Sequence, residues 1–360
     1  MLKILALTVK PDLSPDTRYR ILQYLELFQE AGIEVRHLSL LNRRYYEMTM
    51  RKGQPFLKVV LYVWAWVKRM VQLLALAPRF DAVWVLRELS PVGPPLLERL
   101  LFRLHPRVIL DIDDAIFIPD EASDGFIHHH LRDFTKFKKT AHRYHTVVCG
   151  NRYLAAYFRS LDASVETVPT VVRLEPYAAV RRTPSPRPRL GWIGTPTNRI
   201  HFKIIEAPVR QLAQKLDFEL IVVGLTEKLN WPTANVRYLS WKLSAELDYF
   251  GLFDIGLMPL LDHEFARGKC AFKIIQYMAA GLPVVASPVG ANIDVVQHGV
   301  NGFLAGTEDE WERSLHRLLT DRGLREEMGL RGRQTVREQY SLEIWWKPYA
   351  HIFKKDLDNG

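Results

Sequence analysis

Residues 262–304 read DHEFARGKCAFKIIQYMAAGLPVVASPVGANIDVVQHGVNGFL, and this stretch decides how the chain is organised. A polar loop ending in Gly268 and Lys269 leads into an apolar helix over residues 271–280. Two strands and a short helix follow, at residues 283–286, 302–304 and 292–298. Strands that alternate with helices in this way predict a parallel sheet covered by helices.

The start of the helix over residues 271–280 has the chemistry of an anion site. Helix N-termini present unpaired N–H groups and a partial positive charge, so they attract phosphate. Lys269 and Lys273 are four positions apart and Gln276 lies three beyond, which places all three along one face. Two ammonium groups and an amide there can hold a diphosphate and the ribose next to it. Spacing alone leaves open the alternative that both lysines are simply solvated.

The same alternation extends in both directions from this stretch. Residues 181–189, RRTPSPRPR, contain three prolines and read as an interdomain linker. After them we expect a helix at 201–216 and strands at 190–193, 219–223, 236–239 and 255–258. Before them we expect a helix at 19–31, stopped by Gly32, and strands at 3–7, 34–38, 82–86, 108–111 and 146–149.

This pattern predicts an α/β protein with two Rossmann-like domains. The first covers residues 1–186 and the second residues 187–340, and the amphipathic segment 341–360 forms a C-terminal helix that returns to the first domain. In open parallel sheets, ligands bind outside the carboxyl ends of the strands. We therefore expect the two domains to face each other across a cleft that holds the active site.

The net charge of +9 is concentrated in the first half of the chain. Residues 1–186 carry 27 Lys and Arg against 19 Asp and Glu, whereas residues 187–360 carry 22 against 21. An excess of this kind favours an anionic partner, with a phospholipid surface ahead of nucleic acid, because no nucleic-acid motif is present. The two cysteines, Cys149 and Cys270, are far apart, which fits a reducing, cytoplasmic location and argues against structural zinc.

The most membrane-like segment is residues 55–78. Its longest uncharged run, residues 59–67, is too short to span a bilayer, which needs about 20 apolar residues. Two alternatives remain: a core helix packed on the sheet, or a basic amphipathic helix at the inner face of the membrane. The tract His128-His129-His130 lacks carboxylates at ligand spacing, so we expect an exposed helix there and no metal site.

Several motifs together resemble one large family, the retaining glycosyltransferases of family 4, also called glycosyl transferases group 1, in bacterial form. The similar segments are YMAAGLPVVAS, PVGANIDVV and HGVNGFL, together with LGWIGTPTNRIHF, DIGLMPLLDHEFARGK, VILDIDDAIF and VVCGNRYLAAYF. The resemblance implies the GT-B fold and transfer of a sugar, with retention and without a metal, from a nucleoside-diphosphate sugar to an acceptor hydroxyl. It also implies a role in cell-surface polysaccharide or glycolipid synthesis, with a carbohydrate or lipid-linked acceptor.

The resemblance also implies a donor site in the second domain. Lys269, Lys273 and Arg199 bind the diphosphate, with Gly194 and Thr195 of the GTPTNR turn beside it. Family members commonly carry two glutamates eight positions apart, where this chain has Gly268 and Gln276. Gln276 can still bind ribose, and the role of the other glutamate passes to Glu264 or to backbone amides.

Polar residues at the strand ends of the first domain are candidates for the acceptor side. Asp113 and Asp114 follow strand 108–111, and we expect them to orient or deprotonate the acceptor hydroxyl. The alternative is that they cap the next turn or pair with arginines. Arg18, Arg87 and Glu88 are candidates to hold an anionic acceptor, or else pair among themselves. Two other functions stay open: a non-catalytic binding or scaffold subunit, and a nucleotide-sugar epimerase.

Overall fold

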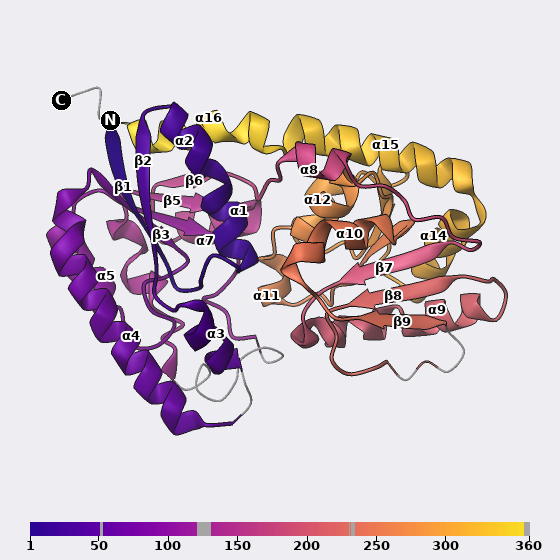
Figure 1. Cartoon of the computed structure of the whole chain (residues 1–360), viewed down its shortest axis with the longest axis horizontal. Coiled ribbons are helices and arrows are strands. Elements are labelled where there is room, and N and C mark those ends of the chain that lie inside the picture. The colour runs from indigo at the N-terminus through magenta and orange to yellow at the C-terminus, as the bar shows by residue number, and fades with distance from the viewer. Residues whose placement is uncertain (51–52, 121–130, 230, 232–234, 356–360) are drawn as a thin grey trace. The chain divides into compact units, whose positions relative to one another are not determined.

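The computed structural model describes the 360-residue chain except for residues 51–52, 121–130, 230, 232–234 and 356–360. The chain divides into two compact units (Figure 1). Unit 1 comprises Met1–Thr170 and Trp345–Gly360, and unit 2 comprises Val171–Ile344. The division lies ahead of the proline-rich residues 181–189, where we placed the linker, because Tyr177 and its neighbours pack on unit 2.

Unit 1 is built on a six-stranded parallel sheet with the order β2-β1-β3-β4-β5-β6. Its strands are β1 (Leu2–Thr8), β2 (Ile33–Ser39), β3 (Ala82–Leu86), β4 (Val108–Ile112), β5 (Thr146–Cys149) and β6 (Val165–Thr167). The middle strands β3, β4 and β5 are buried throughout, as expected for a parallel sheet covered on both faces. The five predicted strands are confirmed. Strand β6 was not predicted, since it is short and only half-buried at the edge.

The helices of unit 1 differ from the sequence prediction at one place. They are α1 (Pro15–Arg20), α2 (Leu25–Glu30), α3 (Arg43–Met50), α4 (Pro55–Leu76), α5 (Leu96–Leu104) and α7 (Arg152–Arg159), with 3-10 turns Leu22–Tyr24, Ala77–Arg79, Phe137–Lys139 and Ala141–Arg143. The continuous helix expected at 19–31 is wrong, because the backbone leaves α geometry at Ile21. Both Arg20 and Ile21 are fully buried there, so tertiary packing overrides helical spacing. Gly32 ends the segment with φ +78°, as predicted.

Unit 2 has a second six-stranded parallel sheet, ordered β12-β11-β10-β7-β8-β9. Its strands are β7 (Arg189–Ile193), β8 (Glu219–Val223), β9 (Val236–Leu239), β10 (Ile255–Met258), β11 (Val284–Ala286) and β12 (Gly302–Leu304). All six strands were predicted within one residue at either end. Counted within the unit, this is the strand order 3-2-1-4-5-6 of dinucleotide-binding domains, so the Rossmann-like prediction is confirmed.

Helices cover this second sheet. They are α8 (Leu174–Ala178), α9 (Glu206–Ala213), α10 (Glu246–Gly251), α11 (Glu264–Arg267), α12 (Phe272–Ala279), α13 (Asn292–Val295), α14 (Glu308–Thr320) and α15 (Arg322–Gln339), with 3-10 segments Pro196–Ile204 and Leu243–Ala245. The single helix expected at 201–216 is wrong. Pro208 has no N–H to bond the carbonyl of Ile204, so a new helix, α9, begins at Glu206 and keeps the proline in its first turn.

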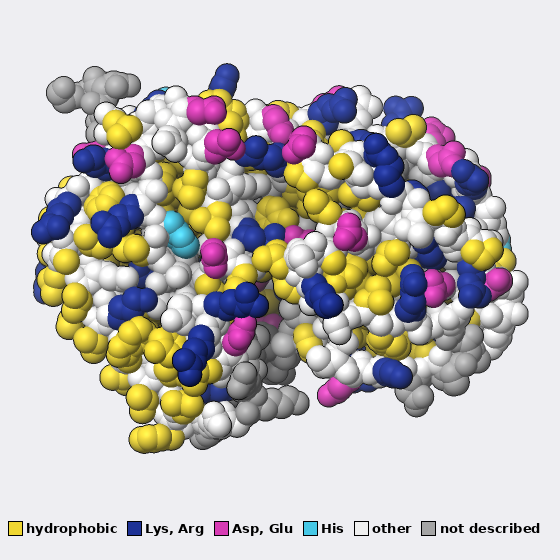
Figure 2. Space-filling model, in the orientation of Figure 1, with side chains coloured by type: hydrophobic (Ala, Val, Ile, Leu, Met, Phe, Trp, Pro, Cys, Tyr) yellow, Lys and Arg dark blue, Asp and Glu magenta, His cyan; other side chains and the backbone are white. Residues whose placement is uncertain are grey.

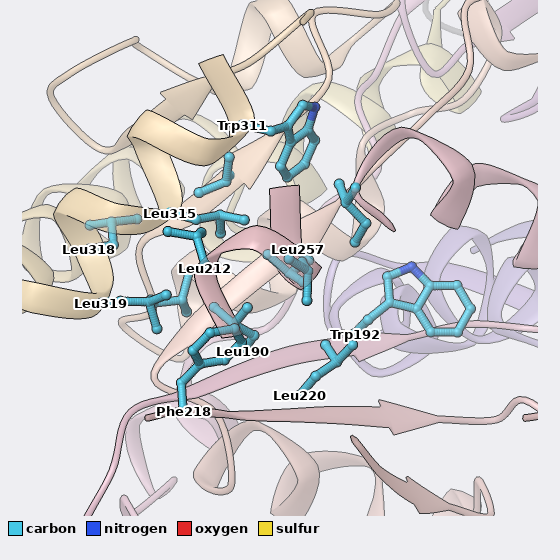
Figure 3. Packing of buried hydrophobic residues seen from close by; sticks show 14 of the residues in the cluster. Leu190, Trp192, Leu212, Phe218, Leu220, Leu257, Trp311, Leu315, Leu318 and Leu319 are labelled. Atoms are coloured by element: carbon cyan, nitrogen blue, oxygen red, sulfur yellow. The ribbon is translucent and has the colours of Figure 1, made fainter. Parts of the chain in front are cut away.

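The core of unit 2 lies between the sheet and helices α9 and α14. Figure 3 shows Trp311 and Leu315 of α14 pointing toward Leu212 of α9 and toward Leu257 and Leu190 on the strands. All five side chains are fully buried. Burying side chains of this size contributes on the order of 1.5–3 kcal/mol each, so this face of the sheet is held rigidly.

Helix α16 (Leu342–Lys354) carries the chain from unit 2 back into unit 1, as predicted. Tyr349 packs edge-on against the ring of Trp84, and Phe353 contacts Trp84 and Phe28. The Tyr349 hydroxyl donates a hydrogen bond to the carboxylate of Asp111 at the end of β4. Residues that are last in the sequence therefore complete the aromatic core of the first unit.

Candidate functional site

The strongest candidate site lies at the carboxyl edge of the unit 2 sheet, between β7 and β10. The strand order reverses there, because β8 and β9 continue to one side of β7 while β11 and β12 continue to the other side of β10. Such a reversal opens a crevice in which α/β domains bind ligands. Gly194 and Thr195 follow β7, and the segment carrying α11 and the start of α12 follows β10. The sequence motif around Lys269 therefore occupies the place that topology alone would indicate.

Lys273 in the first turn of α12 is held in a setting that disfavours its charge. Its ammonium lies 4.8 Å from the centroid of the Trp192 ring, at the end of β7. Burial, and then the charge of Lys269, lower the pKa of Lys273 from 10.5 to about 7. Among the residues that the structure describes, no carboxylate forms an ion pair with Lys273. An anionic ligand at this position would restore the charge that the folded protein suppresses.

Lys269 lies beside Lys273 and is also placed by an aromatic ring. Its ammonium is 4.8 Å from the centroid of Phe265 in α11, within the range of a cation–π interaction. The two lysines therefore hold two positive charges close together at the end of β10. Like charges repel, so the proximity of the two lysines raises the free energy of the ligand-free protein. A bound anion removes this repulsion and is therefore stabilised.

Gly194 allows this close approach. A Cβ at position 194 would lie 2.2 Å from the Trp192 ring and 3.0 Å from the ammonium of Lys273. Gly224, at the end of β8, has φ +92°, and a Cβ there would lie 2.1 Å from the carbonyl oxygen of Gly194. Both positions need glycine for steric reasons, and the turn after β7 is left with an exposed backbone.

The entry into α12 is strained at a single residue. Ala271 has φ 52°, in the left-handed region that residues with a side chain rarely adopt. Its side chain gives the helix no capping hydrogen bond, so the positive end of α12 opens beside Lys269 and Lys273. Backbone strain of this kind costs about 1–3 kcal/mol and gathers at ligand-binding sites.

The remaining residues that we predict to bind the donor differ in their exposure and in their hydrogen-bond partners. The Thr195 hydroxyl hydrogen-bonds Thr197 and Asn198 at 2.9 and 2.8 Å. Arg199 is exposed, lies 3.6 Å from the carboxylate of Glu227 and donates to the carbonyl of Lys228. Contact of Arg199 with phosphate is not tested by the structure and stays a prediction.

Gln276, Glu264 and Gly268 complete the predicted donor set. The Gln276 amide is buried and donates to the hydroxyl of Tyr177 at 3.0 Å. Glu264 is exposed at the start of α11, and Gly268 is buried where that helix ends. The roles that we predict for these three residues also stay predictions.

Three residues of this region were not predicted from the sequence. Trp192 places Lys273, but in the sequence it is one more apolar residue of a strand. Tyr177 is 99 positions from Gln276, too far for any spacing argument. His201 is buried and accepts a hydrogen bond from the N–H of Leu261, which fixes the start of the loop before α11.

Unit 1 has its own strand reversal, between β1 and β3, and charges gather at its carboxyl edge as well. Arg87 has φ 65° and pairs with Asp113 at 2.5 Å, Asp16 at 3.3 Å and Asp114 at 3.7 Å. Lys10 lies 3.0 Å from Asp16. Burial alone would raise the pKa of Asp16, but the charges of Lys10 and Arg87 outweigh it and hold that pKa well below its ordinary value.

The other acceptor-side candidates are paired too. Glu88 is buried, with Arg132 at 2.6 Å and Lys136 at 3.3 Å. Arg18 lies over the ring of Tyr19, its guanidinium carbon 4.9 Å from the centroid. Asp16 was missed from the sequence, since nothing in the loop after the first strand marks it as the partner of Arg87. Acceptor binding by Arg18, Arg87 and Glu88, and catalysis by Asp113 and Asp114, are not tested here and stay predictions.

Within the described residues, no group of three or more His, Cys, Asp or Glu side chains is arranged to hold a metal ion. The tract His128-His129-His130 lies outside the described residues. Cys149 and Cys270 are both buried and neither forms a disulfide, and burial raises the pKa of Cys149 to about 12.

Comparison with known proteins identifies both the C-terminal signature and the fold. Residues 187–321 match the family model described as glycosyl transferases group 1. The chain is 32 % identical over 110 residues to N-acetyl-alpha-D-glucosaminyl L-malate synthase of Bacillus anthracis, covering 29 % of this chain and 28 % of that protein. It is 25 % identical over 167 residues to the capsular polysaccharide biosynthesis glycosyltransferase CapM of Staphylococcus aureus, covering 43 % of this chain and 41 % of CapM. The chain thus spans less than half the length of these curated relatives.

Two solved structures resemble the whole chain. Sucrose-phosphate synthase of Thermosynechococcus elongatus superimposes with a TM-score of 0.71 at 15 % identity, covering 100 % of both chains. Anabaena HepE in complex with UDP-glucose gives a TM-score of 0.64 at 13 % identity, again covering 100 % of both. At this identity the likeness concerns the fold, and it confirms the expected architecture of two Rossmann-like units with C-terminal helices.

Proposed function

We propose that the chain is a glycosyl transferase of group 1 that transfers a sugar from a nucleoside-diphosphate sugar to an acceptor hydroxyl, because residues 187–321 match the model of that family. The family is a retaining one, so the anomeric configuration of the sugar is kept. The proposed reaction breaks the bond between the sugar and the diphosphate and forms a glycosidic bond to the acceptor oxygen. The acceptor proton leaves to a base, and the nucleoside diphosphate departs with growing negative charge.

One observation carries this proposal: the pair Lys269 and Lys273 at the strand reversal of unit 2. The departing diphosphate needs positive charge that is already in place, because fixed charges stabilise a transition state more than mobile ones. Lys273 is partly neutral in the free protein, with a pKa of about 7. A diphosphate beside it draws in a proton, so the site becomes fully charged only when it is occupied.

The surrounding groups support the same assignment. The backbone after Gly194 and the hydroxyl of Thr195 lie at the positive edge, where they can cradle the diphosphate. Arg199 can also bind the diphosphate, by leaving its exposed ion pair with Glu227. Breaking an exposed ion pair costs little free energy. Gln276 offers an amide to ribose, and Glu264 or the backbone at Gly268 approaches the sugar. We assign no metal to this step.

On the acceptor side, we propose that Asp113 or Asp114 orients the incoming hydroxyl. Arg87 pairs with Asp113 at 2.5 Å and so positions this side chain at the edge of unit 1. Arg18 and Glu88 define the borders of this acceptor region. The likeness to CapM supports an acceptor in cell-surface polysaccharide or glycolipid synthesis.

For the donor, uridine diphosphate sugars are the first choice. Support comes from the fold neighbour HepE, whose structures contain UDP and UDP-glucose. The charges of Lys269 and Lys273 recognise only the diphosphate, which all nucleotide sugars share. The base must therefore be identified by experiment.

A thermal-shift panel of UDP, GDP, ADP and dTDP, alone and with their common sugars attached, tests the site. A ligand at 100 times its dissociation constant stabilises the folded protein by about 2.7 kcal/mol. We expect one base to give a shift and Lys273→Ala to weaken that nucleotide at least tenfold. Lys215→Ala is the matched control, because Lys215 is an exposed lysine of the same unit whose partner is Glu312.

Each outcome has a definite meaning. A shift that survives in Lys273→Ala removes Lys273 from the donor site. No shift with any nucleotide contradicts the donor-site assignment itself. Binding without sugar transfer to any acceptor favours the scaffold alternative, and conversion of the nucleotide sugar without an acceptor favours the epimerase.

A further inference from the structure

Helix α4 of unit 1 exposes an apolar stripe along its whole length. Phe56, Val60, Val63, Val67, Val71 and Leu74 are between 45 % and 81 % exposed. They recur every three or four residues, so they share one face of the helix. Figure 2 shows hydrophobic side chains gathered along the edge of the molecule that α4 occupies in Figure 1. Exposed stripes of this extent mark a surface that binds something else.

The opposite face of α4 packs against unit 1 through buried apolar side chains, and it also directs charged groups toward that unit. Arg69 is fully buried and donates to the carbonyl of Thr8, at the end of β1. Lys68 donates to the carbonyls of Ser39 and Leu40 at 3.2 and 2.9 Å. Burial lowers the pKa of Arg69 to about 9. A helix at a water-facing surface normally directs its charges outward and has a polar outer face, whereas the outer face of α4 is apolar.

The charge of the chain is concentrated around the same helix. Residues 43–79 contain eight Lys or Arg and one acidic residue, Glu47. This segment accounts for +7 of the net charge of +9. Arg43 and Arg44 on the neighbouring α3 are exposed, and so is Arg79 just beyond the end of α4. Positive charge therefore flanks the apolar stripe at its sides and end.

We propose that α4 lies in the plane of an anionic lipid surface, as a membrane-docking helix. The stripe enters the boundary between headgroups and acyl chains, and the flanking basic residues meet the anionic headgroups. Trp64, which stacks edge-on with Tyr45 at 5.2 Å, is 46 % exposed beside the stripe and suits the interfacial layer. The core-helix alternative from the sequence accounts for only one face of α4.

Two other occupants fit the observations less well. Residues 56–79 are long and apolar enough to cross a bilayer by length and composition, with a mean hydropathy of 1.5. Crossing would pull Arg69 and Lys68 away from the backbone carbonyls that they bond. A second copy of the chain, docked by a two-fold axis, would bring the same +7 segment against itself. Like charges of this number repel, whereas an anionic membrane attracts them.

Vesicle flotation tests the proposal with the full chain. Vesicles of phosphatidylcholine alone are compared with vesicles containing about 30 % phosphatidylglycerol, at low and at 0.5 M salt (roughly a 3–5 Å screening length). We expect at least tenfold stronger partitioning to the anionic vesicles and loss of most of it at high salt. The triple variant Val63→Ser, Val67→Ser, Val71→Ser should lose at least tenfold at low salt.

The control pair is Leu330→Ser and Ile293→Ser, which removes exposed apolar side chains of unit 2 and should bind as the wild type does. An unfolding temperature that matches the wild type shows that the triple variant is folded. A dye on Val63→Cys should report an apolar environment with anionic vesicles, and the same dye on Leu330→Cys should not. Buried native thiols make this labelling specific.

Three results would overturn the proposal. One is equal binding of the wild type and the triple variant to anionic vesicles, or no binding by either. Another is retention of the protein in membranes through alkaline carbonate washing, which indicates a spanning helix. The third is concentration-dependent dimerisation that the triple variant abolishes, which indicates a second copy on the stripe. None of these readings depends on nucleotide binding, so failure here leaves the proposed function intact.

Discussion

Each of the two sheets has a strand reversal, and the charges at the two carboxyl edges are arranged in opposite ways. In unit 1, the cations Lys10 and Arg87 are paired with carboxylates, chiefly Asp16 and Asp113. In unit 2, Lys269 and Lys273 face aromatic rings, and burial together with the charge of Lys269 lowers the pKa of Lys273. The first edge is neutralised by its own side chains, whereas Lys273 at the second edge has no carboxylate partner among the described residues, so an anionic ligand can neutralise it. The comparison shows that the strand reversal determines where a ligand can bind, and that the charges of the side chains there determine which ligand binds.

The largest expected effect comes from breaking the neutralised edge. Arg87→Met leaves Asp16, Asp113 and Asp114 without their shared partner, and we expect a loss of about 3 kcal/mol of unfolding free energy. Methionine keeps a Cβ, so the strain at φ 65° is unchanged and the experiment isolates the charge. Urea unfolding measures the effect. Arg99→Met, at an exposed position of α5, is the control and should stay within about 0.5 kcal/mol of the wild type.

The second effect concerns the pH dependence of the unneutralised edge. In the free protein the pKa of Lys273 is about 7, and a bound diphosphate raises it, so binding takes up a proton above that pH. Nucleotide affinity should therefore fall between pH 7.5 and 9.5, by up to about tenfold per unit. The phosphate, with a pKa near 6, stays ionised over this range.

Titration calorimetry in buffers of different ionisation enthalpy counts the proton directly. Lys273→Arg keeps its charge at every pH, so its affinity should be level over the same range. A wild-type affinity that does not change with pH would show that Lys273 does not gain charge on binding.

The smallest expected effect is a change in unfolding free energy for Lys273→Met, and its sign is opposite to that expected for Arg87→Met. Lys273→Met removes a cation that folding disfavours, and we expect the nucleotide-free protein to gain about 0.5–2 kcal/mol at pH 7. The unfolded chain holds a proton between pH 7 and 10.5 that the folded chain has lost, so wild-type stability rises with pH in that window. The gain from methionine should shrink accordingly when urea unfolding is repeated at pH 9.5. A variant less stable than the wild type at pH 7 would mean that Lys273 has a structural partner.

The sequence predicted the sheets better than the helices. Parallel strands in the interior are continuous apolar runs between turn residues, and this signal depends on few distant contacts. Helix breaks depend on the surroundings. Pro208 could have been used to divide the helix at 201–216, since its missing N–H is visible in the sequence. The break at Ile21 could not, because it follows from the burial of Arg20 against Asp111.

In the candidate site, too, some features were predictable from the sequence and others depend on contacts between distant residues. Gly194 was predicted because it directly follows a strand, and Lys269 and Lys273 were predicted because they lie at the start of a helix in the connection after β10. The topology then brings the two segments to one edge. The lowered pKa of Lys273 was not predicted, since it results first from burial, which depends on how distant segments pack around the lysine. The pairing of Arg87 with Asp16 likewise joins residues from different strand ends. The exposure of the apolar face of α4 could not be predicted either, because the sequence does not show which face of the helix packs against unit 1.

The return of α16 to unit 1 has a consequence for how the protein is made. Tyr349 and Phe353 contact Trp84 and Phe28, so the first unit cannot complete its core until these residues have left the ribosome. At about 5–20 residues per second, the residues from Val171 onward take on the order of ten to forty seconds to synthesise. Unit 2 is a continuous segment and can fold during that time. The half of the protein translated first is therefore expected to mature last, with its aromatic residues open to chaperones in the interval.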